Sequence, residues 1–227
     1  MIELLKFYKN KRVLITGVTG FKGAWLCLML KMLNSKILGI GYRPNKNEIL
    51  FNELKLKKDI SLKYIDIRDY KKLKKIIKNF SPQIVFHLAA QPLIFESYKD
   101  PVSTININAA GTLNLLDILR EVKTIKSIVC ITSDKCYVNN HSTKGFIETD
   151  RLGGADPYSA SKASAEIIIN AYKESYFKIK KVGIASARAG NVIGGGDWSP
   201  DRLIPDTINS LINNLEKQMA FKPDCKY

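Results

Sequence analysis

The sequence predicts an α/β protein built on a doubly wound parallel sheet. From Arg12 onward, short apolar runs alternate with longer amphipathic segments, and this order favours right-handed strand–helix–strand units with helices on both faces of the sheet. A glycine-rich segment, TGVTGFKG, follows the first apolar run. The chain of 227 residues has room for one large domain, or for one domain and part of a second.

Each expected element has its own residue pattern. The apolar runs predict strands at residues 13–16, 36–40, 62–65, 84–88, 127–132 and 182–186. The amphipathic segments predict helices at residues 22–33, 69–79, 101–120 and 158–177. Asp69 and Pro101 stand where helices of this kind begin.

The formal charge of +15 raises the question of a nucleic-acid partner. In residues 68–78 the lysines share a helix with an apolar stripe formed by Leu73, Ile76 and Ile77, which is typical of a solvated helix face. No nucleic-acid recognition motif accompanies the basic residues, so we expect no nucleic-acid partner.

The remaining composition argues against membranes and metals. No apolar run reaches the roughly 18–20 residues of a membrane span, and the N-terminal segment MIELLKFYKNKR is too polar for a secretory signal. We therefore expect a cytoplasmic protein with no membrane partner. The cysteines, Cys27, Cys130, Cys136 and Cys225, form no CxxC pair, so neither a metal site nor a disulfide framework is expected.

The glycine-rich segment predicts a binding site for a dinucleotide. Gly17, Gly20 and Gly23 are spaced three residues apart between the first strand and the first helix. One glycine allows the tight turn, one lets the backbone approach a pyrophosphate, and one lets helix and strand pack closely. The helix N-terminus then offers free N–H groups and a partial positive charge to the phosphates. The segment therefore indicates a Rossmann-like site for a nicotinamide dinucleotide.

The adenosine end of this site is less clearly defined. Tyr42 and Arg43 occupy the region after the second strand where an acidic residue usually binds the ribose. Arg43 either accommodates a 2′-phosphate, which favours NADP, or lies on the surface and stacks on adenine, so NAD and NADP both stay open. Asp66, after the third strand, is placed either to reach the adenine amino group or to cap a helix.

The motif HLAAQP follows the fourth strand and begins at His87. The small side chains of Ala89 and Ala90 would let the backbone run beside the cofactor. His87 is either a packed core histidine or a contact of the site.

A tyrosine and a lysine form the candidate catalytic pair. Tyr158 and Lys162 are four residues apart on a predicted helix, which places both on one helical face. An ammonium beside a phenol favours the phenolate and is expected to lower the tyrosine pKa from its usual ~10. A hydroxyl partner is expected from residues 132–135 (TSDK), because open α/β sheets keep ligands at the carboxyl ends of their strands.

Together these segments resemble the extended short-chain dehydrogenase/reductase family. The glycine loop, HLAAQP, TSDKCY and YSASK carry the general resemblance. GGADPYSASK and ARAGNVIGGGDWSPDRLIPD are similar to the subgroup of sugar-nucleotide 4,6-dehydratases that act on CDP-glucose. The resemblance implies conversion of CDP-glucose to CDP-4-keto-6-deoxyglucose and water, with NAD as the cofactor and the nucleotide sugar as the partner.

The resemblance also implies roles for individual residues. Tyr158 would take the proton of the C4 hydroxyl, assisted by Ser133 and Lys162. Lys135, where related dehydratases carry Glu, would help to remove the C5 proton, and Asp134 would protonate the departing C6 hydroxyl.

Binding residues are implied in the same way. The cofactor residues are Gly17, Gly20, Phe21, Lys22, Gly23, Asp66, Ile67, Ala89, Ala90, Gln91, Asn108, Tyr158 and Lys162. The substrate residues are Asn191, Gly196, Asp197, Trp198 and Arg202. The triple glycine at residues 194–196 would wrap the sugar nucleotide and Arg202 would meet its phosphates; the alternative is an exposed turn with a solvated Arg.

The similarity runs from about Lys9 to Ile208 and implies two unequal parts. Residues 1–190 would form the NAD-binding domain and residues 191–227 the start of a substrate-binding lobe, with most of that small C-terminal lobe missing. The chain is then an active dehydratase, another nucleotide-sugar dehydratase or epimerase, or a truncated nucleotide-binding module without catalysis. Pairing of the two long helices into a four-helix bundle would make a homodimer.

Overall fold

The computed structural model describes residues 2–44, 49–139 and 144–212. Within them lies a six-stranded parallel sheet with the spatial order β3-β2-β1-β4-β5-β6. Its strands are β1 (Arg12–Thr16), β2 (Lys36–Gly41), β3 (Ser61–Tyr64), β4 (Ile84–His87), β5 (Ser127–Ile131) and β6 (Gly183–Ala187). Every strand lies within one residue of its expected bounds, which confirms the doubly wound parallel sheet.

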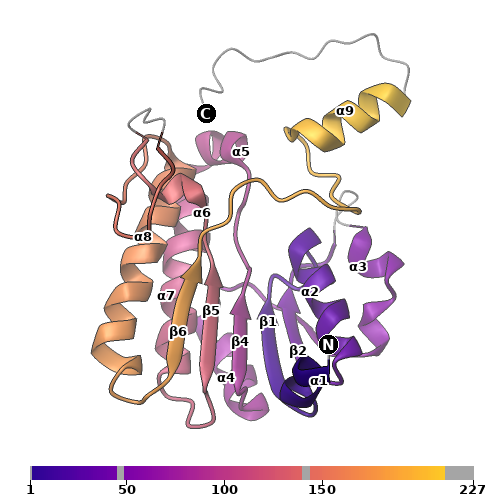
Figure 1. Cartoon of the computed structure of the whole chain (residues 1–227), viewed down its shortest axis with the longest axis vertical. Helices are drawn as coiled ribbons and strands as arrows, with labels where there is room; N and C mark the ends of the chain where they lie inside the picture. Colours follow the sequence, from indigo (N-terminus) through magenta and orange to yellow (C-terminus); the bar gives the residue numbers. More distant parts are fainter. Residues whose placement is uncertain (1, 45–48, 140–143, 213–227) are drawn as a thin grey trace.

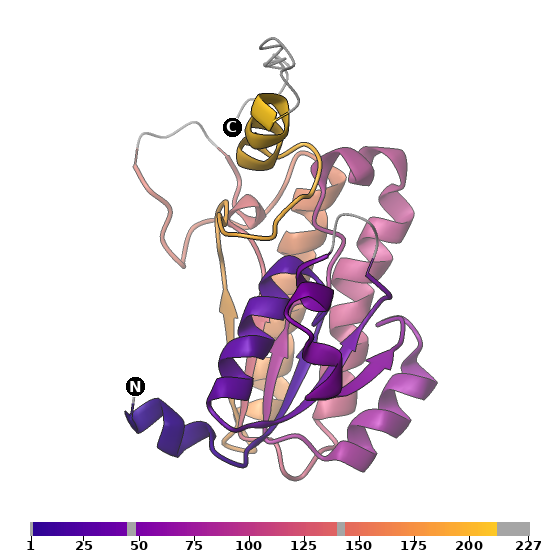
Figure 2. The same cartoon turned by 90° about the vertical axis from the view of Figure 1, so that its right-hand side faces the viewer.

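Helices cover the sheet on both faces (Figures 1 and 2). On one face lie α2 (Phe21–Met32), α3 (Leu50–Glu53) and the short turn η1 (Leu56–Lys58). On the other lie α4 (Tyr70–Phe80), α7 (Gly111–Leu119) and α8 (Pro157–Tyr172). Four helices were not expected from the sequence, namely α1 (Ile2–Tyr8), α3, α5 (Ile94–Lys99) and α9 (Leu203–Ile212).

The two long helices expected from the sequence are present, and each contains a π-helical turn. The first joins α6 (Pro101–Ile105) to α7 through η2 (Asn106–Ala110), and the second continues α8 through η4 (Lys173–Phe177). Such turns insert an extra residue into a helix and occur often at functional sites. Here η2 brings Asn108 to face Gln91 beside the candidate site.

The core is divided between the two faces of the sheet. Along β1, side chains alternate in direction, so that Val13 and Ile15 pack with Phe51 of α3, whereas Leu14 packs with Leu115 of α7. All of these side chains are fully buried. A strand buried on both faces is apolar throughout, which is the pattern that predicted the parallel sheet.

Aspartates fix the N-termini of three helices on the α8 side. The Asp69 carboxylate accepts a hydrogen bond from Lys72 N, and Asp100 accepts one from Ser103 N at the start of α6. At α8 the Asp156 carboxylate accepts from Ser159 N at 2.9 Å, and Pro157 fills the first helical position. These caps determine where α8 begins and therefore where Tyr158 stands.

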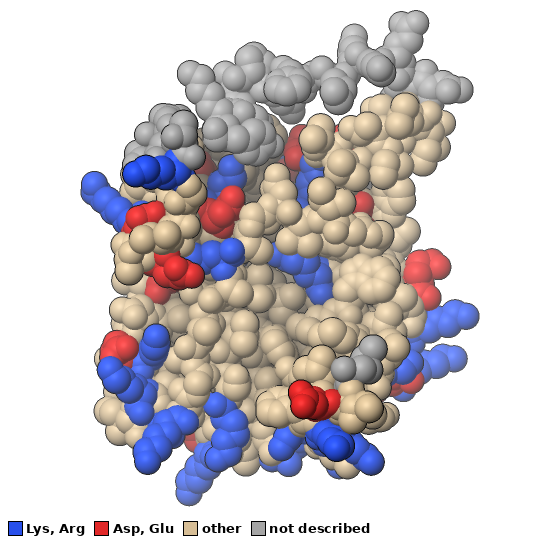
Figure 3. Space-filling view, in the orientation of Figure 1, with Lys and Arg blue, Asp and Glu red and all other residues tan. Residues whose placement is uncertain are grey.

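Charged groups lie around the lower edge and across the upper half of the face shown in Figure 3. Basic side chains lie around its lower edge, intermixed with acidic ones, while uncharged atoms fill the centre over β4–β6. None of the helices in the described ranges combines the length and apolar character that crossing a membrane requires. Cys27, Cys130 and Cys136 are buried free thiols, whereas Cys225 lies outside the described residues.

Candidate functional site

A cleft of about 610 Å³ opens at the carboxyl ends of the strands. The order of the sheet reverses between β1 and β4, and ligands of open α/β sheets bind at this reversal. The cleft wall contains many of the predicted site residues: Gly17, Gly20, Phe21, Lys22, Gly23, Arg43, Ile67, Ala89, Ala90, Gln91, Tyr158, Lys162, Gly196, Asp197 and Arg202. The structure therefore brings the glycine loop and the Tyr–Lys pair to one cavity.

The glycine loop forms a cradle that larger residues would fill. Gly17 has a φ of +70°, and a Cβ there would lie 2.7 Å from the backbone nitrogen of Ala89. A Cβ on Gly23 would lie 2.1 Å from the carbonyl oxygen of Gly17. Gly20 precedes α2 and offers no side chain to cap it, so the first N–H groups of α2 are available to a phosphate. These features fit the pyrophosphate of a dinucleotide.

The end of the cleft near β2 and β3 has a different arrangement from the one expected. Asp66 does not line the cleft, because Arg68 holds its carboxylate through Nε at 3.0 Å and Nη2 at 2.7 Å. The hydrogen bonds from Arg68 lower the pKa of Asp66 to about 2. The helix cap considered for Asp66 is provided by Asp69 instead. Arg43 lines the cleft and lies 5.8 Å from the centre of the Tyr64 ring.

His87 is a core histidine. Its Nδ1 lies 2.6 Å from Thr16 Oγ1 and its Nε2 lies 3.0 Å from Thr112 Oγ1. Complete burial lowers its pKa to about 3, helped by the charge of Lys162. A neutral, doubly hydrogen-bonded ring joins β1 and β4 to α7 and does not face the cleft.

Asn108 supports the site from behind. Its Oδ1 accepts from Gln91 N at 2.8 Å, and its Nδ2 donates to Gln91 O at 3.0 Å and to Ser161 Oγ at 2.8 Å. The Asn108 side chain thus satisfies both backbone groups of Gln91, as a neighbouring strand would, and connects the segment after β4 to α8. Asn108 is buried and does not line the cleft.

Tyr158, Lys162 and Ser133 meet at the carboxyl end of β5. The Lys162 Nζ lies 5.9 Å from the centre of the Tyr158 ring, and the Ser133 side chain is close enough to Tyr158 to act against the rise in its pKa. Burial lowers the pKa of Lys162 to about 8, with a further contribution from the charge of Lys22. The three groups have the arrangement of a proton-transfer site.

The expected fall in the Tyr158 pKa is wrong for this structure. Burial raises the pKa of Tyr158, and the hydrogen bond of Ser133 and the charge of Arg202 oppose that rise. Desolvation disfavours the phenolate, and Lys162 lies beside the ring instead of donating to the hydroxyl. Ser133 and Arg202 are therefore the neighbouring groups that favour the phenolate.

Asp134 and Lys135 form a tight turn, η3 (Asp134–Cys136), after β5. The Ser133 hydroxyl donates to Asp134 Oδ1 at 3.1 Å and accepts from Lys135 N at 3.2 Å. Asp134 is exposed and borders a second hollow, of about 970 Å³, beside β6. Neither Asp134 nor Lys135 lines the cleft of about 610 Å³ that contains the glycine loop.

The segment after β6 crosses the front of α2. Gly194 approaches the ring of Phe21, and Trp25 Nε1 donates to Gly195 O at 2.9 Å. Gly196 has a φ of +85° and packs against Leu50. The triple glycine at residues 194–196 therefore lies close to α2 and α3, and Gly196 alone of the three lines the cleft.

This segment brings an ion pair to the mouth of the cleft. Arg202 Nη1 lies 3.4 Å from the buried carboxylate of Asp197. Both residues line the cleft, whereas Asn191 and Trp198 do not. Arg202 also lowers the pKa of Lys22, after desolvation, which is the larger cause. The mouth of the cleft is therefore basic and suited to phosphate.

Sequence reasoning missed a buried carboxylate, Glu166, and its partner Arg188. The Glu166 side chain is 4% exposed and lies 2.8 Å from Arg188 Nη2. Glu166 occurs four residues after Lys162, a spacing that continues the face of α8 carrying Tyr158 and Lys162. The spacing of Glu166 from Lys162 is visible in the sequence, but its pairing with Arg188 is not, because Arg188 lies on a distant segment after β6.

Comparison with known proteins agrees with this geometry. The sequence model of the family described as GDP-mannose 4,6 dehydratase matches residues 14–221. A CDP-glucose 4,6-dehydratase from Salmonella typhimurium is 46% identical over 92% of this chain and 60% of its own length. A dTDP-D-glucose 4,6-dehydratase from Dictyostelium discoideum is 31% identical over 90% of this chain and 49% of its own length. The chain thus spans about half to three-fifths of these relatives.

Solved structures share the architecture. The epimerase Mth375 from Methanothermobacter thermautotrophicus superposes with a TM-score of 0.80 at 25% identity, covering 93% of this chain and 61% of that one. The dTDP-glucose 4,6-dehydratase from Bacillus anthracis, in complex with NAD, superposes with a TM-score of 0.73 at 25% identity, covering 90% and 62%. The Rossmann-like fold, the cleft at the glycine loop and the matched sequence lead to one conclusion: this chain belongs to the GDP-mannose 4,6-dehydratase family.

Proposed function

We propose that the chain carries the cofactor site and the catalytic groups of an NAD-dependent CDP-glucose 4,6-dehydratase. The observation that carries the proposal is the meeting of Tyr158, Lys162 and Ser133 beside the glycine cradle. The 46% identity to the Salmonella typhimurium CDP-glucose 4,6-dehydratase supports the choice of substrate. The reaction is the loss of water from CDP-glucose to give CDP-4-keto-6-deoxyglucose.

NAD would lie along the cleft, with its pyrophosphate on the first turn of α2. Gly17, Gly20 and Gly23 give the phosphates close access to the backbone. Ala89 and Ala90 would flank the cofactor on the β4 side. When bound, the nicotinamide supplies the hydride acceptor, and later the hydride donor, that the overall reaction needs.

Tyr158 would take the proton of the sugar C4 hydroxyl at its Oη. Because burial raises its pKa, the tyrosine starts protonated and needs help to ionise. Ser133 would provide that help by turning its hydroxyl proton from Asp134 Oδ1 to the phenolate, and the Lys162 ammonium would add a positive charge beside the ring. Arg202 adds a second positive charge at the mouth of the cleft.

The turn after β5 would serve the elimination. In this proposal Lys135 removes the C5 proton, which the 4-keto group has made acidic, and Asp134 protonates the departing C6 hydroxyl. Ser133 holds both through its hydroxyl, accepting from Lys135 N and donating to Asp134 Oδ1. The substrate would enter past Asp197 and Arg202, with Arg202 at the phosphates and Asn191 and Trp198 as further contacts.

The test is incubation of the purified chain with CDP-glucose and NAD, followed by the alkaline absorbance of the 4-keto sugar. We expect product, and we expect Tyr158→Phe to lower kcat on the order of 10²- to 10⁴-fold. Tyr172→Phe is the matched control, since Tyr172 ends the same helix and its hydroxyl binds Asp117 at 3.3 Å. Lys135→Met should slow the loss of water, and an unchanged rate would remove Lys135 from the scheme.

Two other functions are distinguished by the same preparation. If the folded chain binds NAD but forms no product, it is a nucleotide-binding module without catalysis. Formation of UDP-galactose from UDP-glucose would instead indicate an epimerase, as the similarity to the epimerase Mth375 would allow. Tighter binding of NADP than NAD, lost in Arg43→Ala, would assign the cofactor to NADP.

We also propose a homodimer in which α7 and α8 pair with the same helices of a second copy. Ile167 of α8 is 60% exposed and Leu113 of α7 is 39% exposed, so each helix has an apolar side chain to bury. Light scattering at micromolar concentration should give twice the mass of the chain, and a monomer mass would refute this assembly.

A further inference from the structure

The buried carboxylate of Glu166 makes three polar contacts at the catalytic end of the fold. One oxygen accepts a hydrogen bond from Thr132 Oγ1. The other accepts from Ser186 Oγ at 2.8 Å and from Arg188 Nη2 at 2.8 Å. These three partners come from the end of β5, from β6 and from the segment after β6, whereas Glu166 belongs to α8. The carboxylate thus joins one helix to two strand ends.

The charge of Glu166 is balanced by Arg188, whose guanidinium makes further hydrogen bonds to other residues. Arg188 Nη1 donates to Tyr137 Oη at 2.7 Å and to the Glu148 carbonyl at 3.0 Å. The Arg188 guanidinium also lies 4.9 Å from the centre of the Tyr137 ring. Burial alone would raise the pKa of Glu166, but the hydrogen bonds from Arg188, Thr132 and Ser186 lower it. Glu166 is therefore ionised and fixed in place.

Thr132 links this carboxylate to the candidate catalytic site. It directly precedes Ser133, whose side chain acts on the pKa of Tyr158. The backbone of the same residues is tied to β6 and the segment that follows it, with Thr132 N donating to Ala187 O at 3.0 Å and Asp134 N donating to Ala189 O at 3.2 Å. The side chain of Thr132, through its hydrogen bond to Glu166, ties this turn directly to α8.

We propose that Glu166 is a positioning residue that acts through Thr132: it holds the turn of Ser133 at a fixed distance from α8, so that the Ser133 hydroxyl reaches Tyr158. This role rests on the proposed function only where it concerns turnover. Tyr158, Lys162 and Glu166 follow one another at four-residue intervals along α8, so one helix face carries the phenol, the ammonium and the anchor. A shift of this turn by a fraction of an ångström would lengthen the Ser133–Tyr158 contact.

The test separates positioning from stability by cutting the link at Thr132 and leaving the Glu166–Arg188 pair intact. Thr132→Val removes the hydroxyl with little change in volume, and Thr132→Ser restores it. Thr124→Val is the matched control, because Thr124 Oγ1 donates to Ser81 O and Pro82 O at the opposite end of the sheet. Two quantities are measured for each variant, namely turnover of CDP-glucose and the ionisation of Tyr158.

The ionisation of Tyr158 is read by NMR of tyrosine labelled with ¹³C at Cζ, and the spectrum of Tyr158→Phe assigns the signal. Besides Ser133, four charged groups act on the phenol: Lys162 on its own helix, Asp156 at the cap, Asp134 after β5, and Arg202 near α9. None of them is altered in these variants. A change in the Tyr158 pKa therefore reports the Ser133 contact.

Thr132→Val should raise the Tyr158 pKa by about one unit relative to the unaltered chain. It should also lower kcat on the order of 10- to 100-fold with KM for CDP-glucose nearly unchanged. Thr132→Ser should recover both quantities, and Thr124→Val should match the unaltered chain. An unchanged Tyr158 pKa in folded Thr132→Val would overturn the proposal. If the unaltered chain makes no 4-keto sugar, the dehydratase assignment fails, while the Tyr158 titration still decides the role of Glu166.

Discussion

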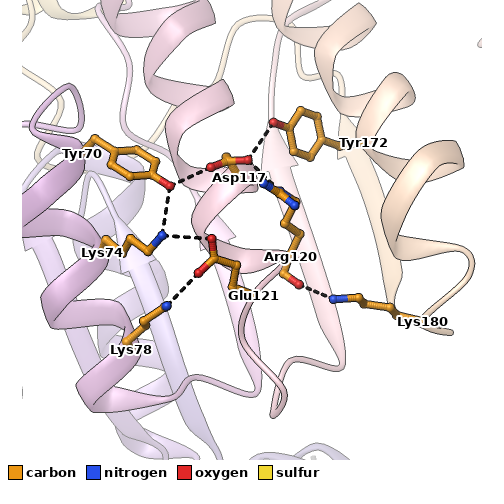
Figure 4. Close-up of polar contacts among 8 residues, drawn as sticks. All are labelled: Tyr70, Lys74, Lys78, Asp117, Arg120, Glu121, Tyr172 and Lys180. Atoms are coloured by element: carbon orange, nitrogen blue, oxygen red, sulfur yellow. Dashed lines mark hydrogen bonds and ion pairs between the residues drawn. The ribbon is translucent and has the colours of Figure 1, made fainter.

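Two carboxylate networks in this molecule have similar partners and opposite surroundings. At the end of the sheet that carries the candidate site, Glu166 is 4% exposed and pairs with Arg188, which is 17% exposed. On the outer surface of the helices, Asp117 and Glu121 of the α7 region are 25% and 32% exposed. The network around these two residues is shown in Figure 4. Both networks combine tyrosine hydroxyls with basic groups, so the difference between them lies in burial and in what they connect.

The exposed network joins three helices to one another. Asp117 accepts from Tyr70 at 2.7 Å and from Arg120 Nε at 2.6 Å, and Tyr172 reaches it from α8 (Figure 4). Glu121 pairs with Lys74 at 2.9 Å and with Lys78 at 2.7 Å. Water can replace any of these contacts, because each group is partly solvated. Pairs of this kind contribute little to stability.

The buried network joins α8 to strand ends that carry the candidate site. Both members of the Glu166–Arg188 pair are largely buried, so removal of one leaves the other with a charge that water solvates poorly. Arg188 Nε already lacks a hydrogen-bond partner among the described residues. The comparison teaches that the number of partners does not measure the importance of a carboxylate. Its importance depends on whether water can replace the lost hydrogen bonds, and on whether its partners belong to the candidate functional site.

The largest effect is expected when each carboxylate is removed. Glu166→Ala should lower the free energy of unfolding by about 3–5 kcal/mol, because Arg188, which is only 17% exposed, loses the carboxylate that balances its charge. Glu121→Ala should leave it within experimental error, because Lys74 and Lys78 turn to water. Urea unfolding followed by circular dichroism gives both values. Equal losses in the two variants would contradict the contrast, and so would a strong dependence of the Glu166 loss on salt.

A second expected difference concerns pH and the lysines of the two regions. Burial, followed by the charge of Lys22, lowers the pKa of Lys162 to about 8. Between pH 8 and about 10.4 the unfolded chain therefore binds the proton that the folded chain has released. Through Lys162, stability should rise with pH in this window.

Lys74 in the exposed network should behave in the opposite direction. The hydrogen bonds of Glu121 and Tyr70 raise the pKa of Lys74, so its small contribution is present at neutral pH and is lost as the pH rises through the folded value. In the unaltered chain and in Lys74→Met, the free energy of unfolding should contain a contribution that rises between pH 8 and 10. In Lys162→Met this rise should be absent. Other groups titrate here, so the differences between variants and the unaltered chain are compared. Parallel curves for Lys162→Met and the unaltered chain would contradict the prediction.

The same contrast explains how much the sequence revealed. The strands were predicted to within one residue because a strand buried on both faces, such as β1 with Val13, Leu14 and Ile15, has no alternative period. The short helices α1, α3 and α5 were missed because 4 to 7 residues hold too little periodicity to be seen. A strand buried on both faces can therefore be predicted from its sequence, whereas a helix of one or two turns cannot.

For the candidate site too, short sequence motifs were predictable and contacts between distant segments were not. The glycine loop and the Tyr158–Lys162 pair are local patterns, and the structure brings them to one cleft. The pairing of Asp66 with Arg68 spans only two residues, whereas the partners expected for Asp66 were adenine or a helix N-terminus. The Glu166–Arg188 pair joins α8 to the chain after β6, so no local rule predicts it. The rise in the Tyr158 pKa depends on burial, which only the folded chain defines.

The smallest expected effect comes from removing one tyrosine hydroxyl from each network. In Tyr137→Phe, Arg188 Nη1 loses its 2.7 Å acceptor and keeps only the Glu148 carbonyl, which should cost about 1–2 kcal/mol of unfolding free energy. In Tyr70→Phe, Asp117 keeps Arg120 and Tyr172 and gains water, so the cost should stay below about 1 kcal/mol. Matched urea titrations of the two variants decide the order. A larger loss in Tyr70→Phe would mean that the helix surface, and not the buried carboxylate, holds the fold together, and the role assigned to burial would then be wrong.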